Sequence, residues 1–495
     1  MTSSIHEKAA LAVLSLCLHF ALLVLSGCSQ TAPPVTTPAT GKVNTYFGGP
    51  FIVTTNPVGR SSSSFDHSAN QIAVSAFVNT GQSLLVPTQV LSGSFTSANT
   101  GFLAVSENFA TTNSGYGPQN PPLAGAWAVE IPGAGALANL LSVQTVQSGT
   151  GSIATIVTAA PAAMVDNTAC PDFPGQTTFL YVNVPNPFTV SSIDTSNYGT
   201  VGIATQGSDV TFSATPYLIG HLPGTASVVT GGCSISTLGA VTSYPLNSYG
   251  QPSNVELISV AKSGLLASSF NSTGSVSTVG AFGGGNGVIG VQEPSSPVDV
   301  SAVIGEKYNG FVYAPNNAVT GTYDITVLAS AFGNHAGDSP ACSALQASLA
   351  ANHGGGAGTV AALPSPNTIY GGEFLTVGSS SSVNDPSGAL GSENCDVAID
   401  LGTQDSTSSG TFSNATIFVG SNYPPFSASN PWNCFGTTSV CAVSFPAAAI
   451  VGQVQGQYVS FVAASANSIP PAQLPNNFSS RVAQPVGIYL FQRSQ

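Results

Sequence analysis

Short runs rich in Val, Ile, Thr, Phe and Tyr recur along the whole chain, separated by Gly, Asn, Ser and Pro; residues 209–215, 298–304 and 411–419 are three of them. β-Branched and aromatic residues favour extended strands, and the separating residues favour turns. Roughly twenty such runs predict an all-β protein built from several sandwich- or barrel-like antiparallel domains. No period of about 20 to 50 residues repeats through the chain, which disfavours a propeller or a solenoid.

One short helix is predicted near residues 339–353. Ser339 can cap its N-terminus, Pro340 suits its first position, and Gly354 follows its end. Three residues share one face of this helix: Cys342, Leu345 and Leu349. We therefore expect this face to pack against the β structure.

Charged side chains make up only 5% of the chain, whereas about 25% is usual in soluble domains. Seven Lys and Arg stand against 20 Asp and Glu, which gives a net charge of −13. So few basic residues cannot neutralise a phosphate backbone, and nucleic acid is therefore excluded as a partner.

An apolar run at residues 9–25 follows a lysine near the N-terminus, as in the core of a signal peptide. The run ends in four residues: Leu25, Ser26, Gly27 and Cys28. This end resembles the lipobox of bacterial lipoproteins. The resemblance implies that residues 1–27 are a lipoprotein signal peptide and that Cys28 receives acyl chains such as palmitate. An uncleaved anchor, or a secretory signal with a chance cysteine, is the alternative.

The resemblance also predicts where the protein resides. Two or three acyl chains hold a protein stably on a membrane, so the membrane is an expected partner through the lipid anchor. Residues 28–44 then comprise the lipidated cysteine and a Pro/Thr-rich tether. Ser29 follows the cysteine, and in the lipoprotein family this permits delivery to the outer membrane. We expect a lipid-anchored protein of the cell envelope, on the outer membrane, facing the periplasm or the surface.

Cysteine usage agrees with export. Apart from Cys17 and Cys28, the chain has six cysteines: Cys170, Cys233, Cys342, Cys395, Cys434 and Cys441. An even number in an exported chain predicts disulfides, and the spacings fit no zinc pattern, so no metal site is assigned. Proximity along the chain favours three pairs: 170 with 233, 342 with 395, and 434 with 441.

Domain boundaries are expected where linker-like composition appears. The segment 280–297 is rich in Gly and then in Pro and Ser, and is the best boundary. We divide the remainder into a first β region at 45–165, a second at 166–297, and a C-terminal β domain with the short helix at 298–495.

Two motifs resemble enzyme or cofactor sites only in their letters. The Gly-rich segment 285–290 lacks a following helix to hold a pyrophosphate, because Pro294 would break a helix that began there. No nucleotide or other cofactor is therefore expected. Residues 335–339 bring His, Asp and Ser close in sequence, but no nucleophile elbow accompanies them. We interpret them as a loop and a helix cap at Asp338 or Ser339, and assign no catalytic residue.

The densest acidic stretch holds Glu393, Asp396, Asp400 and Asp405. In a strand, Asp396 and Asp400 point to one face, about 13 Å apart, which is too far to share an ion directly. A solvated face is the favoured interpretation, and a calcium site is the alternative.

Aromatic residues and prolines concentrate in residues 422–435. Tyr423, Phe426 and Trp432 in this segment are the candidate binding residues, because exposed rings form stacking platforms for sugars or for apolar groups of a partner. The alternative is that these rings close the end of a β domain.

Together these observations predict a lipid-anchored envelope lipoprotein that presents β domains for adhesion or for binding a ligand, with a glycan or an envelope protein as partner. No catalysis is evident. Two alternatives stay open: an exported hydrolase acting on polysaccharide, and a purely structural envelope component.

Overall fold

The structure is a computed structural model that describes the strands, two helices and some of their connections. The described residues are 43–48, 59–66, 71–79, 85–94, 102–104, 123–131, 133–147, 153–165, 173, 175–183, 198–206, 209–215, 222–229, 232–237, 256–268, 288–313, 325–327, 330–334, 338–351, 353, 362–372, 375–377, 395–419, 443–464 and 487–492. They all belong to one compact unit, residues 40–495.

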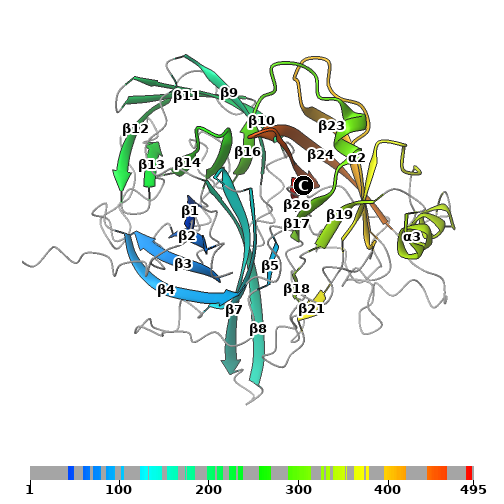
Figure 1. The fold of residues 1–495 in the computed structure, drawn as a ribbon, viewed down its shortest axis with the longest axis horizontal. Helices are drawn as coiled ribbons and strands as arrows, with labels where there is room; N and C mark the ends of the chain where they lie inside the picture. The colour runs from blue at the N-terminus through cyan, green and yellow to red at the C-terminus, as the bar shows by residue number, and fades with distance from the viewer. Residues whose placement is uncertain are drawn as a thin grey trace, which may run out of the picture. The chain divides into compact units, whose positions relative to one another are not determined.

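Antiparallel strands dominate the described part of the chain, and three sheets contain them (Figure 1). The prediction of an all-β fold is confirmed. The helix predicted near 339–353 is also confirmed, as α3 (Pro340–Ala351).

A second helix, α2 (Val300–Gly305), lies where the sequence pattern predicted a strand over 298–304. The strand prediction was wrong because of a cap. The carboxylate of Asp299 accepts hydrogen bonds from the backbone N–H groups of Ser301 and Ala302, at 3.0 and 3.4 Å. An Asp in this position satisfies the free N–H groups of a first helical turn and so favours helix over strand.

The first sheet has eight strands in the order β4-β3-β2-β1-β8-β7-β6-β5. They are β1 (Val43–Gly48), β2 (Gly59–Asp66), β3 (Gln71–Asn79), β4 (Leu85–Ser94), β5 (Phe102–Ala104), β6 (Leu123–Ile131), β7 (Gly135–Gln147) and β8 (Ile153–Val165). Each pairs with the next in the chain except β4 with β5, which lie at the two ends of this order and do not pair within the described residues.

The second sheet is a closed barrel of eight strands, in which each strand pairs with the next and the last returns to the first. They are β9 (Thr177–Asn183), β10 (Tyr198–Gln206), β11 (Asp209–Thr215), β12 (Leu222–Val229), β13 (Gly232–Thr237), β14 (Glu256–Val260), β15 (Leu265–Ser268) and β16 (Val288–Gln292). This arrangement leaves no free edge among them.

The third sheet has ten strands in the order β19-β20-β22-β23-β24-β25-β26-β17-β18-β21. They are β17 (Tyr308–Tyr313), β18 (Ile325–Val327), β19 (Ser330–Asn334), β20 (Thr368–Gly371), β21 (Leu375–Val377), β22 (Val397–Asp400), β23 (Thr411–Val419), β24 (Val443–Val454), β25 (Gln457–Ala464) and β26 (Gly487–Gln492). Because β17 also pairs with β19, eight of these strands close a cycle of pairings, and β18 with β21 extends from it.

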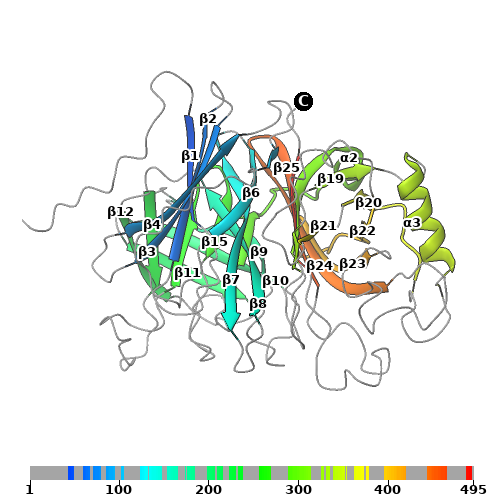
Figure 2. The same ribbon diagram turned by 90° about the horizontal axis from the view of Figure 1, so that it is seen from below.

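The interior of the third sheet is an apolar core. Val397 and Ile399 of β22 lie in this core, as strand alternation predicts. The other face of β22 is buried as well, because α3 lies beside β20, β22 and β23 (Figure 2). Asp396 and Asp400 were expected on a solvated face, but they are only 8% and 9% exposed. That expectation was wrong, because it considered the strand without the helix and loop that cover it.

Candidate functional site

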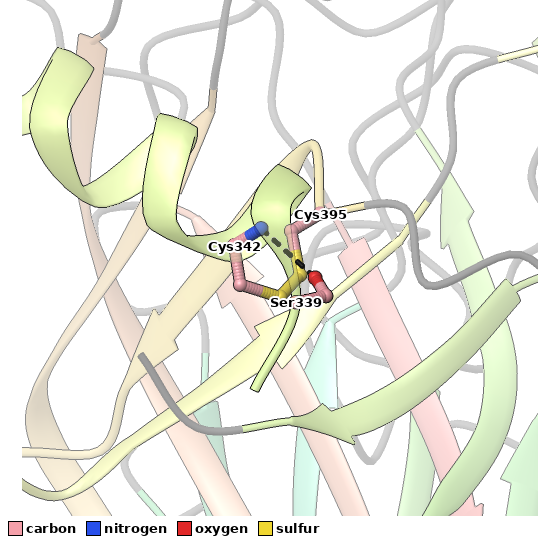
Figure 3. The surroundings of a disulfide bond; sticks show 3 residues. All are labelled: Ser339, Cys342 and Cys395. Atoms are coloured by element: carbon pink, nitrogen blue, oxygen red, sulfur yellow. Dashed lines mark hydrogen bonds between the residues drawn. A yellow bond between two sulfur atoms is a disulfide. The ribbon is translucent and has the colours of Figure 1, made fainter. Parts of the chain in front are cut away.

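A disulfide joins α3 to the start of β22, and it is the best-defined chemical feature among the predicted sites. Cys342 and Cys395 are bonded through their sulfur atoms, with 4.8 Å between their Cα atoms (Figure 3). Both side chains are buried, at 0% and 5% exposure. This pairing, predicted from proximity along the chain, is confirmed.

The start of α3 follows from its sequence. The Ser339 hydroxyl accepts a hydrogen bond from the Cys342 backbone N–H at 3.1 Å, and Pro340 occupies the first helical position, where an N–H is not needed (Figure 3). Ser339 is 3% exposed. Its hydroxyl therefore caps a helix, which confirms the cap interpretation. His335, the histidine of that motif, lies outside the described residues.

Leucines hold the inner face of α3 against the third sheet. Leu345 and Leu349 pack in one buried cluster with Tyr370, Ala398 and Phe418 from three adjacent strands. Burial of Tyr370, and secondarily the negative charge of Asp400, raises the pKa of the tyrosine above its usual value. The helix has no charged side chain of its own, so apolar packing and the disulfide are its principal attachments.

Two carboxylates of the acidic stretch accept hydrogen bonds from nearby backbone N–H groups and serine hydroxyls. Asp400 accepts three hydrogen bonds: from the Ser365 backbone N–H at 2.7 Å, the Ser365 hydroxyl at 2.6 Å and the Gly402 N–H at 2.8 Å. Asp405 likewise accepts hydrogen bonds from the backbone and hydroxyl of Ser413. These carboxylates fasten two loops to the third sheet. Glu393 lies outside the described residues.

A buried tyrosine–carboxylate pair in the first sheet escaped the sequence analysis. The Tyr46 hydroxyl donates to Glu130 at 2.9 Å and accepts from the backbone N–H of Gly133 at 2.8 Å. Tyr46 is 1% exposed and Glu130 is 4% exposed. Glu130 interrupts an apolar strand pattern, and this was the one available signal, but its partner is 84 positions away.

Turns from all three sheets meet beside this pair. The Gln455 side-chain amide, in the β24–β25 turn, donates to the carbonyl of Gly133 at 2.7 Å. The Ser263 hydroxyl, between β14 and β15, lies 3.3 Å from the carbonyl of Ala134 and donates to it. The turn between β6 and β7 is therefore bonded to the other two sheets.

Several predicted sites lie outside the described residues. They are the lipobox residues Leu25, Ser26 and Gly27 with Cys28, the candidate binding residues Tyr423, Phe426 and Trp432, and the cysteines Cys170, Cys434 and Cys441. The main chain of Cys233 belongs to β13, but the structure does not describe its side chain. These predictions stay predictions.

The described residues contain no group of three or more His, Cys, Asp or Glu side chains placed to hold a metal ion. Neither of the two helices described has the length and apolar character that a membrane crossing needs. No family model matches the chain, and no curated protein matches it either.

Proposed function

We propose that this protein is a lipoprotein of the cell envelope, anchored by acyl chains on Cys28, that presents its β sheets for adhesion or for binding a ligand or an envelope partner. The anchor belongs to the outer membrane, and the sheets face the periplasm or the surface. The observation that carries the proposal is the lipobox-like end of the N-terminal apolar run, residues 25–28.

The Cys342–Cys395 disulfide supports the exported location. Disulfides form and persist in oxidising compartments such as the periplasm and the cell surface, and they are rare in the cytosol. This bond joins residues 53 positions apart and lies under a helix. A chain that folds around such a bond is suited to export.

The composition of the chain supports a binding role that depends on neutral contacts. With 5% charged residues, the protein has few groups for long-range electrostatic attraction. Contacts to a partner would then depend on shape, hydrogen bonds and aromatic stacking, for which Tyr423, Phe426 and Trp432 are the proposed residues. A partner of this kind is a neutral glycan or an envelope protein.

Metabolic labelling with an alkyne fatty acid tests the anchor. The wild type and Cys17→Ser, a matched control inside the apolar run, should take up label and sediment with membranes. Cys28→Ser should lose the label and accumulate as the uncleaved precursor. Label that persists in Cys28→Ser, or wild-type protein without label, would contradict the anchor.

Binding is tested separately on the full protein in detergent, by thermal shift with soluble polysaccharides, peptidoglycan fragments and calcium. A ligand at 100 times its dissociation constant stabilises the folded state by about 2.7 kcal/mol, which is readily measured. Tyr423→Ala and Trp432→Ala should abolish the shift if the aromatic segment binds. No shift with any glycan would contradict glycan binding and leave the anchor result unaffected.

A further inference from the structure

We infer that residues 43–492 are a threefold repeat of one eight-stranded unit, and that the three units contact one another as the subunits of a cyclic trimer do. The inference goes beyond the proposed function and does not depend on it. It rests on strand order, on pairing register, on equivalent residues and on the contacts between sheets.

Strand order is the same in all three sheets. We number the eight strands of each unit as positions 1 to 8, in chain order. In the first sheet these positions are β1 to β8, and in the second sheet they are β9 to β16. The third runs as β17, β19, β20, β22, β23, β24, β25 and β26. In each sheet successive positions pair antiparallel, and position 8 returns to position 1; the β4–β5 gap is the exception. The strands β18 and β21 and the helix α3 are additions within the third unit.

Pairing register aligns the units residue by residue. In each sheet several rows of paired residues cross positions 1, 8, 7 and 6, and we align the units on the complete row nearest the turn between positions 6 and 7. The rows are Phe47–Val165–Gly135–Ile131, Leu180–Val291–Leu265–Ala261 and Asn309–Phe491–Val459–Gly452. Ala261 directly follows β14 and continues its pairing, since its backbone N–H donates to the carbonyl of Leu265 at 2.9 Å. These rows supply an alignment that no sequence period revealed.

The alignment brings similar residues together. The residue before the row in position 1 is a large aromatic side chain, at most 1% exposed: Tyr46, Phe179 and Tyr308. Each turn between positions 6 and 7 also has a glycine with a positive φ: Gly133 at 75°, Gly264 at 97° and Gly456 at 81°. These glycines follow the row by different numbers of residues, so the three turns share a need for a positive φ, which is costly for other residues, but not one aligned position.

Contacts between the sheets also repeat. Positions 8 and 1 of one sheet contact positions 6 and 7 of the next. The first sheet meets the second through β8 and β1 against β14 and β15, and the second meets the third through β16 and β9 against β24 and β25. The third sheet then meets the first through β26 and β17 against β6 and β7. A head-to-tail contact that closes after three steps is the rule of a cyclic trimer.

Two row residues face each other at the contact between the second and third sheets. A Cβ atom added to Gly452 would lie 2.7 Å from a methyl carbon of Val291, so the row residue in position 8 of the second unit faces the row residue in position 6 of the third. Equivalence then predicts that Val165 faces Ala261 and that Phe491 faces Ile131.

Cysteine cross-linking in the full chain tests the cycle. We expect disulfides in Val291→Cys with Gly452→Cys, in Val165→Cys with Ala261→Cys, and in Phe491→Cys with Ile131→Cys. Peptide mass spectrometry without reduction identifies each bond beside the native ones. Matched controls recombine the same cysteines, as in Val165→Cys with Gly452→Cys, and should form no bond within one molecule. Cross-links in recombined pairs, or in the first pair alone, would overturn the inference.

Transplanting a residue pair gives an independent test, because it probes equivalence inside the units. Glu130 precedes the row in position 6, and its equivalent in the second unit is Val260. Val260→Glu should lower the melting temperature, and Phe179→Tyr added to it should restore most of the loss by recreating the Tyr46–Glu130 hydrogen bond. Leu180→Tyr, one residue out of register, should restore none. A double variant no more stable than Val260→Glu would overturn the inference.

Discussion

Removing the Cys342–Cys395 disulfide should lower the stability of the third sheet by a predictable amount. The bond joins residues 53 positions apart. In the chain-entropy model, a closed loop of this length restricts the unfolded chain enough to contribute about 4 kcal/mol. The third sheet belongs to a stretch of about 150 to 250 residues, and for a folding unit of that size a loss of about 4 kcal/mol lowers the melting temperature by roughly 8 to 16 °C.

Cys342→Ala with Cys395→Ala is the appropriate variant, because it removes both thiols and leaves neither free to form another bond. Calorimetry measures the melting temperature, and hydrogen exchange measures the protection of the α3 amides. Ser343→Ala, on the exposed face of α3, is the matched control and should melt as the wild type does. Protection should fall first in α3, since the disulfide is one of its two principal attachments.

A melting temperature lowered by less than about 3 °C would refute this reasoning. It would mean that the packing of Leu345 and Leu349 alone holds α3, or that the unfolded chain is compact in this region without the bond.

Three further predictions concern single substitutions. Asp400→Asn should destabilise the third sheet by about 1.5 to 3 kcal/mol in urea unfolding, since a charged acceptor of three hydrogen bonds is lost; an unchanged midpoint would contradict that role. Gly410→Ala should severely reduce folded protein, because φ is 78° and the new Cβ would collide with the carbonyl of Val451, whereas Gly175→Ala, with nothing within 4 Å, should be tolerated. Burial raises the pKa of Tyr489 above its ordinary 10, so the unfolded chain releases this proton first and stability falls as pH rises above 10, by about 1.4 kcal/mol per pH unit. Tyr489→Phe should show a shallower alkaline decline in urea titrations, and an unchanged slope would disprove this assignment.

Much of the local structure could be predicted from the sequence. Strands, turns and α3 depend on the residue types of short segments, and the Ser339 cap and Pro340 depend on immediate neighbours. The Cys342–Cys395 pair followed from proximity along the chain. The exception was α2, where the Asp299 cap outweighed an apolar pattern too short to distinguish helix from strand.

Only the tertiary structure decided which strands pair with each other and which polar groups are buried. Tyr46 and Glu130 are 84 positions apart, and Gln455 and Gly133 are 322 apart, so no local pattern pairs them. Asp400 is a buried anchor because a loop 35 positions away folds over it. A strand pattern of period two specifies the two faces of a strand but not its neighbours. Those neighbours depend on long-range register, which is settled only when the whole sheet forms.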